Sequence, residues 1–283
     1  MRLSTVETVL EYEVCEPTHF CFNIEAAHWP TQTIARETLA ISSGVKPHAF
    51  TDAISGNRFV RFDAQPGPLL VNYRADVEVT FDPVGDDVPE TPVGQVPDEV
   101  FRYLLPTRYC ESDVLGTVAQ QLFGDGPSGI ERVRRVVRWI NQSIVYLPGS
   151  STSTTTAQEV FVRRAGVCRD FAHLGISFCR ALNIPARLVA GYVWFDEPPQ
   201  DFHAIFEAWL DGRWILFDAT GMAPVDRLVR IGTGSDAKDV AFSTFFGNVT
   251  MTRKEVNVIE HDARAGETSG APSVALAASS ATC

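Results

Sequence analysis

Apolar and polar residues alternate along most of the first 81 residues. The alternation is clear over residues 12–14, 20–24, 57–64 and 68–81, and turn-forming residues separate these segments. A period of two places successive side chains on opposite faces of a strand, so that one face can be buried. The pattern therefore predicts a β-rich N-terminal region.

The composition changes after this region, and the period changes with it. Residues 82–97 are dense in proline, glycine and acidic residues, which favours a linker or long loop. Beyond them, apolar residues recur at helical spacing. Three of the predicted helix starts carry N-capping signals: Ser112, Ser128 with Glu131, and Thr156 with Glu159.

A fourth helix is predicted to begin at Cys168, just after the third closes at Gly166. Apolar residues again recur at helical spacing, and Asn183-Ile184-Pro185 ends the segment. Strand signals follow, and Asp211-Gly212 is a strong signal for a two-residue hairpin turn. Helices followed by antiparallel strands indicate an α+β arrangement.

These patterns divide the chain into three predicted parts. Residues 1–97 form a β-rich N-terminal domain with its linker, and residues 98–262 form the α+β domain. Residues 263–283 are rich in alanine, serine, threonine and glycine, and we predict a disordered tail there.

Composition and charge limit the possible partners. The chain has 283 residues, 45% of them hydrophobic, which is enough for a sizeable core. Its net charge of −11 opposes binding to nucleic acid or to an anionic membrane, so we expect neither as a partner. One arginine-rich segment is interpreted as a solvated helix face rather than an anion site: Arg132, Arg134, Arg135 and Arg138.

The sequence also predicts a cytoplasmic location. Glu7, Glu11 and Glu13 interrupt the apolar stretch that a signal peptide needs, and no segment approaches the roughly 18 apolar residues of a membrane span. In that compartment the cysteines are expected to be reduced thiols. They are Cys15, Cys21, Cys110, Cys168, Cys179 and Cys283.

We expect no metal and no cofactor. Cys15, His19, Cys21 and His28 lack the paired spacing of a zinc site and are interpreted as core or turn residues. An oxygen-rich calcium loop of the EF-hand type is also missing from the sequence.

Cys168 is the candidate nucleophile because of its position at a helix start. Unpaired backbone N–H groups and the helix dipole favour the thiolate there, and the same N–H groups can hold the oxyanion of a tetrahedral intermediate. Val167 and Arg169, on either side, are therefore candidate oxyanion or substrate-binding residues. Cys179, farther along the same helix, is interpreted as a core residue.

His203 is the candidate base, and the hairpin provides its partner. The turn fixes the strand register so that Ile205 faces Asp218, which makes Asp218 a diagonal neighbour of His203 on the same face. A carboxylate there can orient the imidazole of a Cys-His pair. Asp201 is a weaker candidate for that role, and His173 is expected to be structural because it points away from Cys168.

Four segments resemble the bacterial transglutaminase-like family in order, spacing and flanking residues. They are AGVCRDFAHLGISFCRALNIPARLVAGY, DFHAIFEAWLDGRWILFDAT, YLLPTRYCESD and VRIGTGSDAKDVAFSTFFGNVT. The resemblance covers nearly the whole chain to about residue 260, including the N-terminal β domain. It implies a papain-like α+β core with Cys168 as nucleophile, His203 as base and Asp218 as orienting carboxylate.

The resemblance also bears on the aromatic residues that precede Cys168. Family members place an aromatic side chain beside the thiol at such an interval, which makes Tyr146 a candidate for shaping the site. Trp139 is interpreted as a core residue. Glu207 and Trp209 share the face of His203, and they either line the site or fill the core behind it.

Two functions from different classes follow. The first is an enzyme that acts on a peptide or protein amide, forms a thioester on Cys168 and passes the acyl group to water or to a primary amine. The second is a non-catalytic protein- or peptide-binding module on the same fold. The sequence leaves hydrolysis and transamidation as open alternatives, because water or an amine can reach the thioester.

Overall fold

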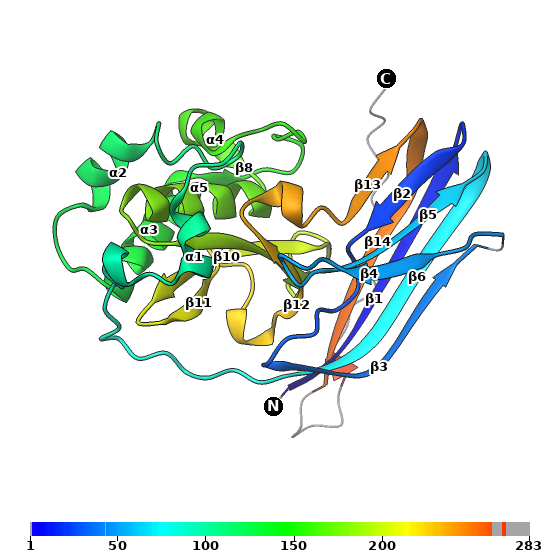
Figure 1. Cartoon of the computed structure of the whole chain (residues 1–283), viewed down its shortest axis with the longest axis horizontal. Helices are drawn as coiled ribbons and strands as arrows, with labels where there is room; N and C mark the ends of the chain where they lie inside the picture. Colours follow the sequence, from blue (N-terminus) through cyan, green and yellow to red (C-terminus); the bar gives the residue numbers. More distant parts are fainter. Residues whose placement is uncertain (1, 43, 262–267, 270–283) are drawn as a thin grey trace.

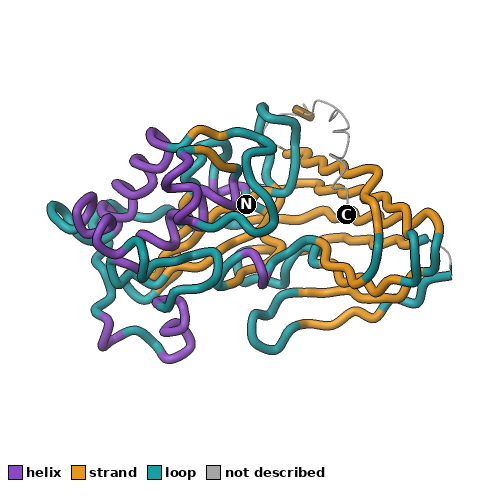
Figure 2. The backbone as a smooth tube through the Cα atoms, turned by 90° about the horizontal axis from the view of Figure 1, so that it is seen from above, coloured by secondary structure: helices purple, strands orange, loops and turns teal. Residues whose placement is uncertain are grey.

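The computed structural model describes residues 2–42, 44–261 and 268–269. Of the predicted tail, residues 263–267 and 270–283 lie outside the described residues. One part of the molecule consists of long strands, and in the other part helices cover a sheet (Figure 1). A second view shows the helices on one side and the long strands on the other (Figure 2). The predicted α+β class is confirmed.

Two antiparallel sheets make up the strand-rich part. Their strand orders are β15-β14-β1-β6-β3 and β13-β2-β5-β4. The strands are β1 (Arg2–Val14), β2 (Thr18–Phe22), β3 (Gln32–Ile41), β4 (His48–Thr51), β5 (Arg58–Ala64), β6 (Gly67–Val79), β13 (Ser243–Phe246), β14 (Val249–His261) and β15 (Thr268–Ser269).

The predicted alternation places about every second side chain of β1, β2, β5 and β6 in a core between the sheets. Along β6, buried residues alternate with more exposed ones from Leu69 to Val79. In the other sheet the rings of Phe20 and Phe22 stack on Phe62, and both lie edge-on to Tyr12 of β1. Burial of these large apolar side chains stabilises the pairing of the two sheets.

The strands β13 and β14 lie in the N-terminal sheets, although the prediction places them in the α+β domain of residues 98–262. β14 pairs along its length with β1, from Leu3 opposite His261 to Val14 opposite Val249, and β13 pairs with β2. Residues 243–261 therefore complete the N-terminal sheets. Local strand patterns identify β13 and β14 as strands but carry no information about their partners, which lie more than 220 residues away in the chain.

In the second part, α5 (Cys168–Ala181) is the central helix. It packs against the sheet β11-β10-β9-β12 and against α2, α3 and α4, so its residues 170–180 are all buried. The other helices and strands are α1 (Asp98–Phe101), α2 (Gly116–Phe123), α3 (Ile130–Ser143), α4 (Ala157–Arg163), β7 (Val145–Tyr146), β8 (Ala165–Gly166), β9 (Ala186–Tyr192), β10 (His203–Leu210), β11 (Arg213–Phe217) and β12 (Val229–Gly234). Short 3-10 turns cover Val93–Gln95, Arg102–Leu104, Val225–Arg227 and Ala237–Asp239.

One of the three predicted N-caps is confirmed. Thr156 and Glu159 form the full capping box at the start of α4. Ser112 does not cap α2, which begins at Gly116 with Leu115 at the N-cap. α4 itself ends before the predicted Gly166, since Arg164 adopts a left-handed conformation.

The predicted Ser128–Glu131 capping box is also wrong. α3 begins at Ile130, and the linker satisfies its first N–H groups: Gly129 donates to Glu90 Oε1 at 2.8 Å and Ile130 donates to the Val88 carbonyl at 2.8 Å. The Glu131 side chain pairs instead with Arg138. A tertiary contact has replaced the local cap that the sequence pattern indicates.

The two parts join along the free edge of β12. The Asn57 side chain donates to the Thr233 carbonyl and accepts from the Thr233 N–H, both at 2.9 Å. Gln32 makes the same kind of pair with the backbone of Arg230, at 3.0 and 2.8 Å. Two amide side chains of the N-terminal part thus satisfy the backbone groups that an edge strand leaves open.

Among the described residues, we find no helix with the length and apolar character that a membrane crossing requires.

Candidate active site

Cys168 is the first residue of α5, as predicted. Val167 precedes it in an extended conformation, and the Asp170 carboxylate accepts the Val167 N–H at 2.9 Å. A Cβ atom at Gly166 would lie 2.8 Å from the Cβ of Asp170, so this close turn requires glycine. The turn places the thiol at the N-terminus of the helix, where the dipole favours a thiolate.

The hairpin places His203 beside Asp218. Asp211 and Gly212 both have positive φ, the geometry of a type I′ turn, and the observed pairs run from Leu210–Arg213 to Phe206–Phe217. His203 Nε2 lies 3.0 Å from Asp218 Oδ2, and the two side chains are 1% and 5% exposed. The structure therefore brings together the pair that the register indicates.

Three further hydrogen bonds fix the Asp218 carboxylate. Oδ1 accepts from the Thr220 N–H at 2.8 Å and from the Thr220 hydroxyl at 2.7 Å, and Oδ2 accepts from the Ala223 N–H at 3.3 Å. Burial would raise the pKa of Asp218, but the hydrogen bond and the charge of His203 outweigh it and hold the pKa below its usual range. Asp218 is therefore a fixed anion.

The electrostatics favour a charged imidazole. Burial alone would lower the pKa of His203, but the hydrogen bond with Asp218 and the neighbouring Cys168 outweigh it and raise the pKa to about 10. The thiol also faces the Phe202 carbonyl, with 4.0 Å from Sγ to the oxygen. An imidazolium between a thiol and a carboxylate stabilises the thiolate, as a Cys-His nucleophile requires.

The weaker alternative to Asp218 has another partner. Asp201 Oδ2 binds Lys254 Nζ at 2.5 Å, and its Oδ1 accepts the Phe202 N–H at 2.8 Å. Its carboxylate lines the same cavity as Cys168, but the carboxylate bound to the His203 ring is that of Asp218.

Tyr146 lies beside the thiol. It belongs to β7, which runs parallel to β8 with Tyr146 opposite Gly166. Burial, and after it the charge of the neighbouring Cys168, raise the pKa of Tyr146. This proximity makes the Tyr146 hydroxyl a candidate donor to an oxyanion formed by attack of Cys168.

The side chain of Arg169 is held at the edge of the site. Its guanidinium donates to the Thr152 carbonyl at 2.7 Å, to the Ser151 hydroxyl at 3.2 Å and to Asp170 at 3.1 Å. It lines the cavity, whereas Val167 contributes only backbone geometry at the helix start.

Cys168 and His203 share a cavity of about 560 Å³. Its apolar wall includes Leu188, Ile231, Val240 and Phe242. The N-terminal part also contributes, and the sequence-based prediction did not include these residues: Asn23, Ser243, Thr244 and Lys254. No local motif could have indicated them, because β13 and β14 reach the site only through their pairing with β1 and β2.

Other residues noted in the sequence have structural roles. His173 is fully buried, stacks on Tyr109 with 5.3 Å between ring centroids and accepts the Ala237 N–H at 3.1 Å. Burial lowers its pKa to about 3. Cys179 is buried in the core, as predicted, and the Trp139 ring packs against Phe178.

The buried Glu207 is an ion-pair partner rather than part of the site. It binds Arg187 at 2.5 Å and Arg230 at 2.8 Å. Trp209, on the same strand, packs edge-on against Trp214. The four arginines of α3 find local partners in Glu90, Asp86, Glu131 and the carbonyls of Phe123, Asp125 and Pro127.

The described cysteines and metal-binding residue types form no metal site. His19 pairs with Asp63 at 2.7 Å, and the five cysteines within the described ranges are free thiols. Over the same ranges, no three His, Cys, Asp or Glu side chains converge in a way that would hold a metal ion.

The fold and this constellation define a class of protein: an α+β core in which a helix presents a cysteine to a His-Asp pair on a sheet. Residues 116–219 match the family model of the transglutaminase-like superfamily. Residues 1–98 match that of the bacterial transglutaminase N-terminal domain. The chain belongs to the transglutaminase-like superfamily and carries the bacterial N-terminal domain.

A solved relative supports the same assignment over the whole chain. It is a crystal structure from Cytophaga hutchinsonii, provisionally described as a cysteine protease. The two share 36% identity with a TM-score of 0.89, and the match covers 96% of this chain and 93% of that one.

Two curated relatives are uncharacterised mycobacterial proteins. One, from Mycobacterium leprae, is 27% identical over 154 residues, which are 51% of this chain and 53% of the relative. The other, from Mycobacterium tuberculosis, is 35% identical over 125 residues, 39% of this chain and 40% of the relative. The matches therefore span only about half the length of these relatives, or less.

Proposed function

We propose that this protein is a cysteine enzyme that cleaves an amide bond through a thioester on Cys168. The observation that carries the proposal is the buried His203–Asp218 pair at 3.0 Å, whose His203 ring lines the same cavity as the Cys168 thiol at the start of α5. A merely structural cysteine does not require a fixed imidazolium beside it.

The first half of the reaction forms the acyl-enzyme. The Cys168 thiolate attacks the carbonyl carbon of the amide, and the oxyanion is stabilised by the N–H groups at the start of α5 and by the Tyr146 hydroxyl. As the C–N bond breaks, His203 gives its proton to the departing nitrogen, which leaves as ammonia or an amine. Asp218 keeps the imidazole oriented throughout.

The second half releases the acyl group. The neutral His203 accepts a proton from water or from an amine as that molecule attacks the thioester carbonyl. The C–S bond breaks, and the Cys168–His203 ion pair forms again. Water yields a carboxylic acid, whereas an amine yields a new amide.

Alkylation tests whether Cys168 is activated, because the chain offers an internal control. Cys15 is an exposed thiol outside the site. Treated with limiting iodoacetamide at about pH 6, Cys168 should be alkylated at least about tenfold faster than Cys15, as measured by peptide mapping, because an unperturbed thiol with a pKa of about 8.5 is mostly protonated there.

Variants and substrates complete the test. Incubation with a peptide library, with and without a primary amine, should give ammonia release and mass shifts that Cys168→Ala abolishes and Cys15→Ala preserves. Equal alkylation rates for the two thiols, with no turnover of any peptide, would instead support a non-catalytic peptide-binding module.

A further inference from the structure

Lysine is rare in this chain, and its distribution is uneven. The sequence contains three lysines: Lys46, Lys238 and Lys254. Two of them, Lys238 and Lys254, line the cavity that contains Cys168 and His203. Arg169 lines the same cavity. Three cationic side chains therefore line the candidate active site, although the net charge of the protein is −11.

The carboxylates that pair with these cations lie mostly outside the cavity. Lys254 binds Asp201 at 2.5 Å, and Asp201 is the one acidic residue among the described residues that line the cavity. Lys238 lies 3.4 Å from Asp239, and Arg169 binds the fully buried Asp170, neither of which lines the cavity. Besides the Cys168–His203 pair, the lining thus carries three cations and one anion.

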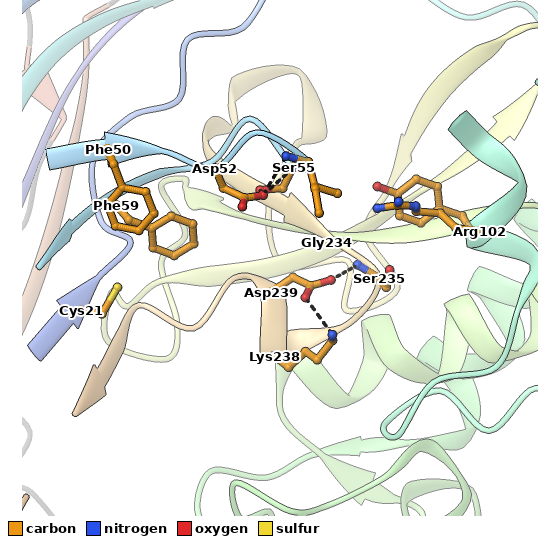
Figure 3. A pocket seen from close by; sticks show the side chains of 12 residues that line it. Cys21, Phe50, Asp52, Ser55, Phe59, Arg102, Gly234, Ser235, Lys238 and Asp239 are labelled. Carbon is orange, nitrogen blue, oxygen red and sulfur yellow. Dashed lines mark hydrogen bonds and ion pairs between the residues drawn. The ribbon is translucent and has the colours of Figure 1, made fainter. Parts of the chain in front are cut away.

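A neighbouring pocket of about 550 Å³ is lined by the cations Arg102 and Lys238 and by two carboxylates (Figure 3). Lys238 lines both cavities, and its side chain is 66% exposed. Arg102 is exposed at the far side, and its guanidinium makes no hydrogen bond or ion pair with the described residues. The stacked rings of Phe50 and Phe59 supply an apolar wall.

The two carboxylates of that pocket already accept hydrogen bonds from neighbouring residues. Asp52 accepts hydrogen bonds from the Ser55 N–H and hydroxyl, both at 2.7 Å. Asp239 accepts the Ser235 N–H at 2.8 Å and faces Lys238, as the dashed lines in Figure 3 show. Arg102 and the exposed Lys238 are therefore the charges most available to a bound molecule.

Charges around a cleft select among substrates by their sign. Focused potentials attract molecules of opposite charge and raise their association rates by about 10- to 1,000-fold, while like charges are rejected. A carboxylate near Lys238 and Lys254 is attracted, whereas a protonated amine is repelled. An acyl donor and an amine acceptor would meet opposite electrostatic conditions in this cavity.

We propose that the cavity selects peptides with acidic side chains beside the reacting amide and excludes protonated amines as acceptors. Water then takes the acyl group, so that the products are a carboxylic acid and the released nitrogen compound. This inference rests on the proposed thioester chemistry and narrows it to hydrolysis of acidic peptides.

Electrophilic peptides test the charge selection without turnover. Two vinyl sulfone probes share one apolar residue next to the electrophile and differ in two flanking residues, Asp-Asp in one and Lys-Lys in the other. The second-order rate of Cys168 modification is measured by intact-protein mass, and each rate is divided by the iodoacetamide rate of the same variant. The ratio for the acidic probe to the basic probe should be about tenfold or more.

Reversing the charge of Lys238 or Arg102 should lower this ratio, and the same change at Lys46 is a matched control. Lys238→Glu should lower the ratio about tenfold, and Arg102→Glu should lower it by a smaller factor. Both residues are exposed, so either variant can fold. Lys46→Glu makes the same charge change on the exposed loop of the N-terminal part and should leave the ratio unchanged.

Dividing each rate by the iodoacetamide rate separates the proposed charge selection from the proposed function. A ratio near one in the unmodified protein, or equal effects of Lys238→Glu and Lys46→Glu, overturns the charge selection while leaving the nucleophile intact. Loss of the fast iodoacetamide reaction overturns the proposed function itself. Incorporation of cadaverine, a doubly charged amine, at a rate matching hydrolysis would overturn the exclusion of amines.

Discussion

Single residues set the chemistry of this site through one buried chain of contacts. Thr220 donates a hydrogen bond to Asp218, Asp218 binds His203, and His203 lines the same cavity as the Cys168 thiol. The opposite pKa directions of the two middle groups, raised for His203 and lowered for Asp218, have one cause, because each stabilises the charge of the other.

This coupling gives a definite pH dependence. His203 has a pKa of about 10 in the folded protein and about 6.5 when unfolded, so the stability it contributes is complete below about pH 6.5 and is lost as the pH rises through 10. The lowered pKa of Asp218 contributes stability above its ordinary value, and this is lost as the pH falls. The free energy of unfolding should therefore decline on both sides of neutral pH.

Asp218→Asn should remove the negative charge that stabilises the charged form of His203. Without the anion, burial dominates and lowers the pKa of His203, so the imidazole is neutral near pH 7 and no longer stabilises the thiolate. The rate of Cys168 alkylation at pH 7 should fall about 100-fold, and the rise of the rate with pH should move to higher pH, because the thiolate then forms without an imidazolium beside it.

The matched control removes a similar pair at the surface. Asp63 binds His19 at 2.7 Å and is 80% exposed. Asp63→Asn should leave the profile unchanged, and an equal effect of the two variants would refute the coupling.

At the scale of elements, α5 carries the proposed nucleophile and must lie close to β10. Gly175 makes this approach possible, because a Cβ atom there would lie 2.6 to 3.0 Å from the ring of Phe206. The apolar spacing of the sequence predicts this helix and its first residue, but the close packing of a glycine on a phenylalanine depends on how the helix meets the sheet.

Gly175→Ala should destabilise the protein by about 1–3 kcal/mol, since the overpacking outweighs the gain in helix propensity. It should also slow Cys168 alkylation, because α5 must shift relative to His203. Urea unfolding and alkylation rates measure the two effects. Gly116→Ala, in α2 with open space around it, is the control and should be neutral or stabilising.

At the scale of the whole molecule, the N-terminal part packs against the helical part and also forms one wall of the candidate site. Tyr192 of β9 is buried in its core and donates to the Ile24 carbonyl, and Asn23 and Lys254 line the cavity of Cys168. The second part is an insertion between β6 and β13, held by strands from both ends of the chain. The interface that joins the two parts therefore also forms part of the cavity wall.

Asn57→Ala should weaken this interface. It leaves the buried N–H and carbonyl of Thr233 without partners, which costs about 2–4 kcal/mol in the free energy of unfolding. Urea denaturation measures the loss. Gln121→Ala, on the exposed face of α2, should change stability by less than about 0.5 kcal/mol. A loss of similar size in both variants would contradict a specific role for Asn57.

The sequence by itself determined the features that depend on short-range spacing. The start of α5 at Cys168, the Asp211-Gly212 turn and the diagonal placement of Asp218 beside His203 follow from helix periodicity and from a two-residue turn that permits one register. The local capping pattern at Thr156 was equally sufficient.

Only the tertiary structure decided which distant segments meet. The linker rather than Ser128 satisfies the start of α3, β14 pairs with β1, and Lys254 reaches the cavity from the other end of the chain. An alternating pattern indicates that a segment is a strand and needs another strand to pair with. An apolar face indicates that the segment must be buried against another element. The choice among all available partners is made by the packing of the whole chain, which no local pattern contains.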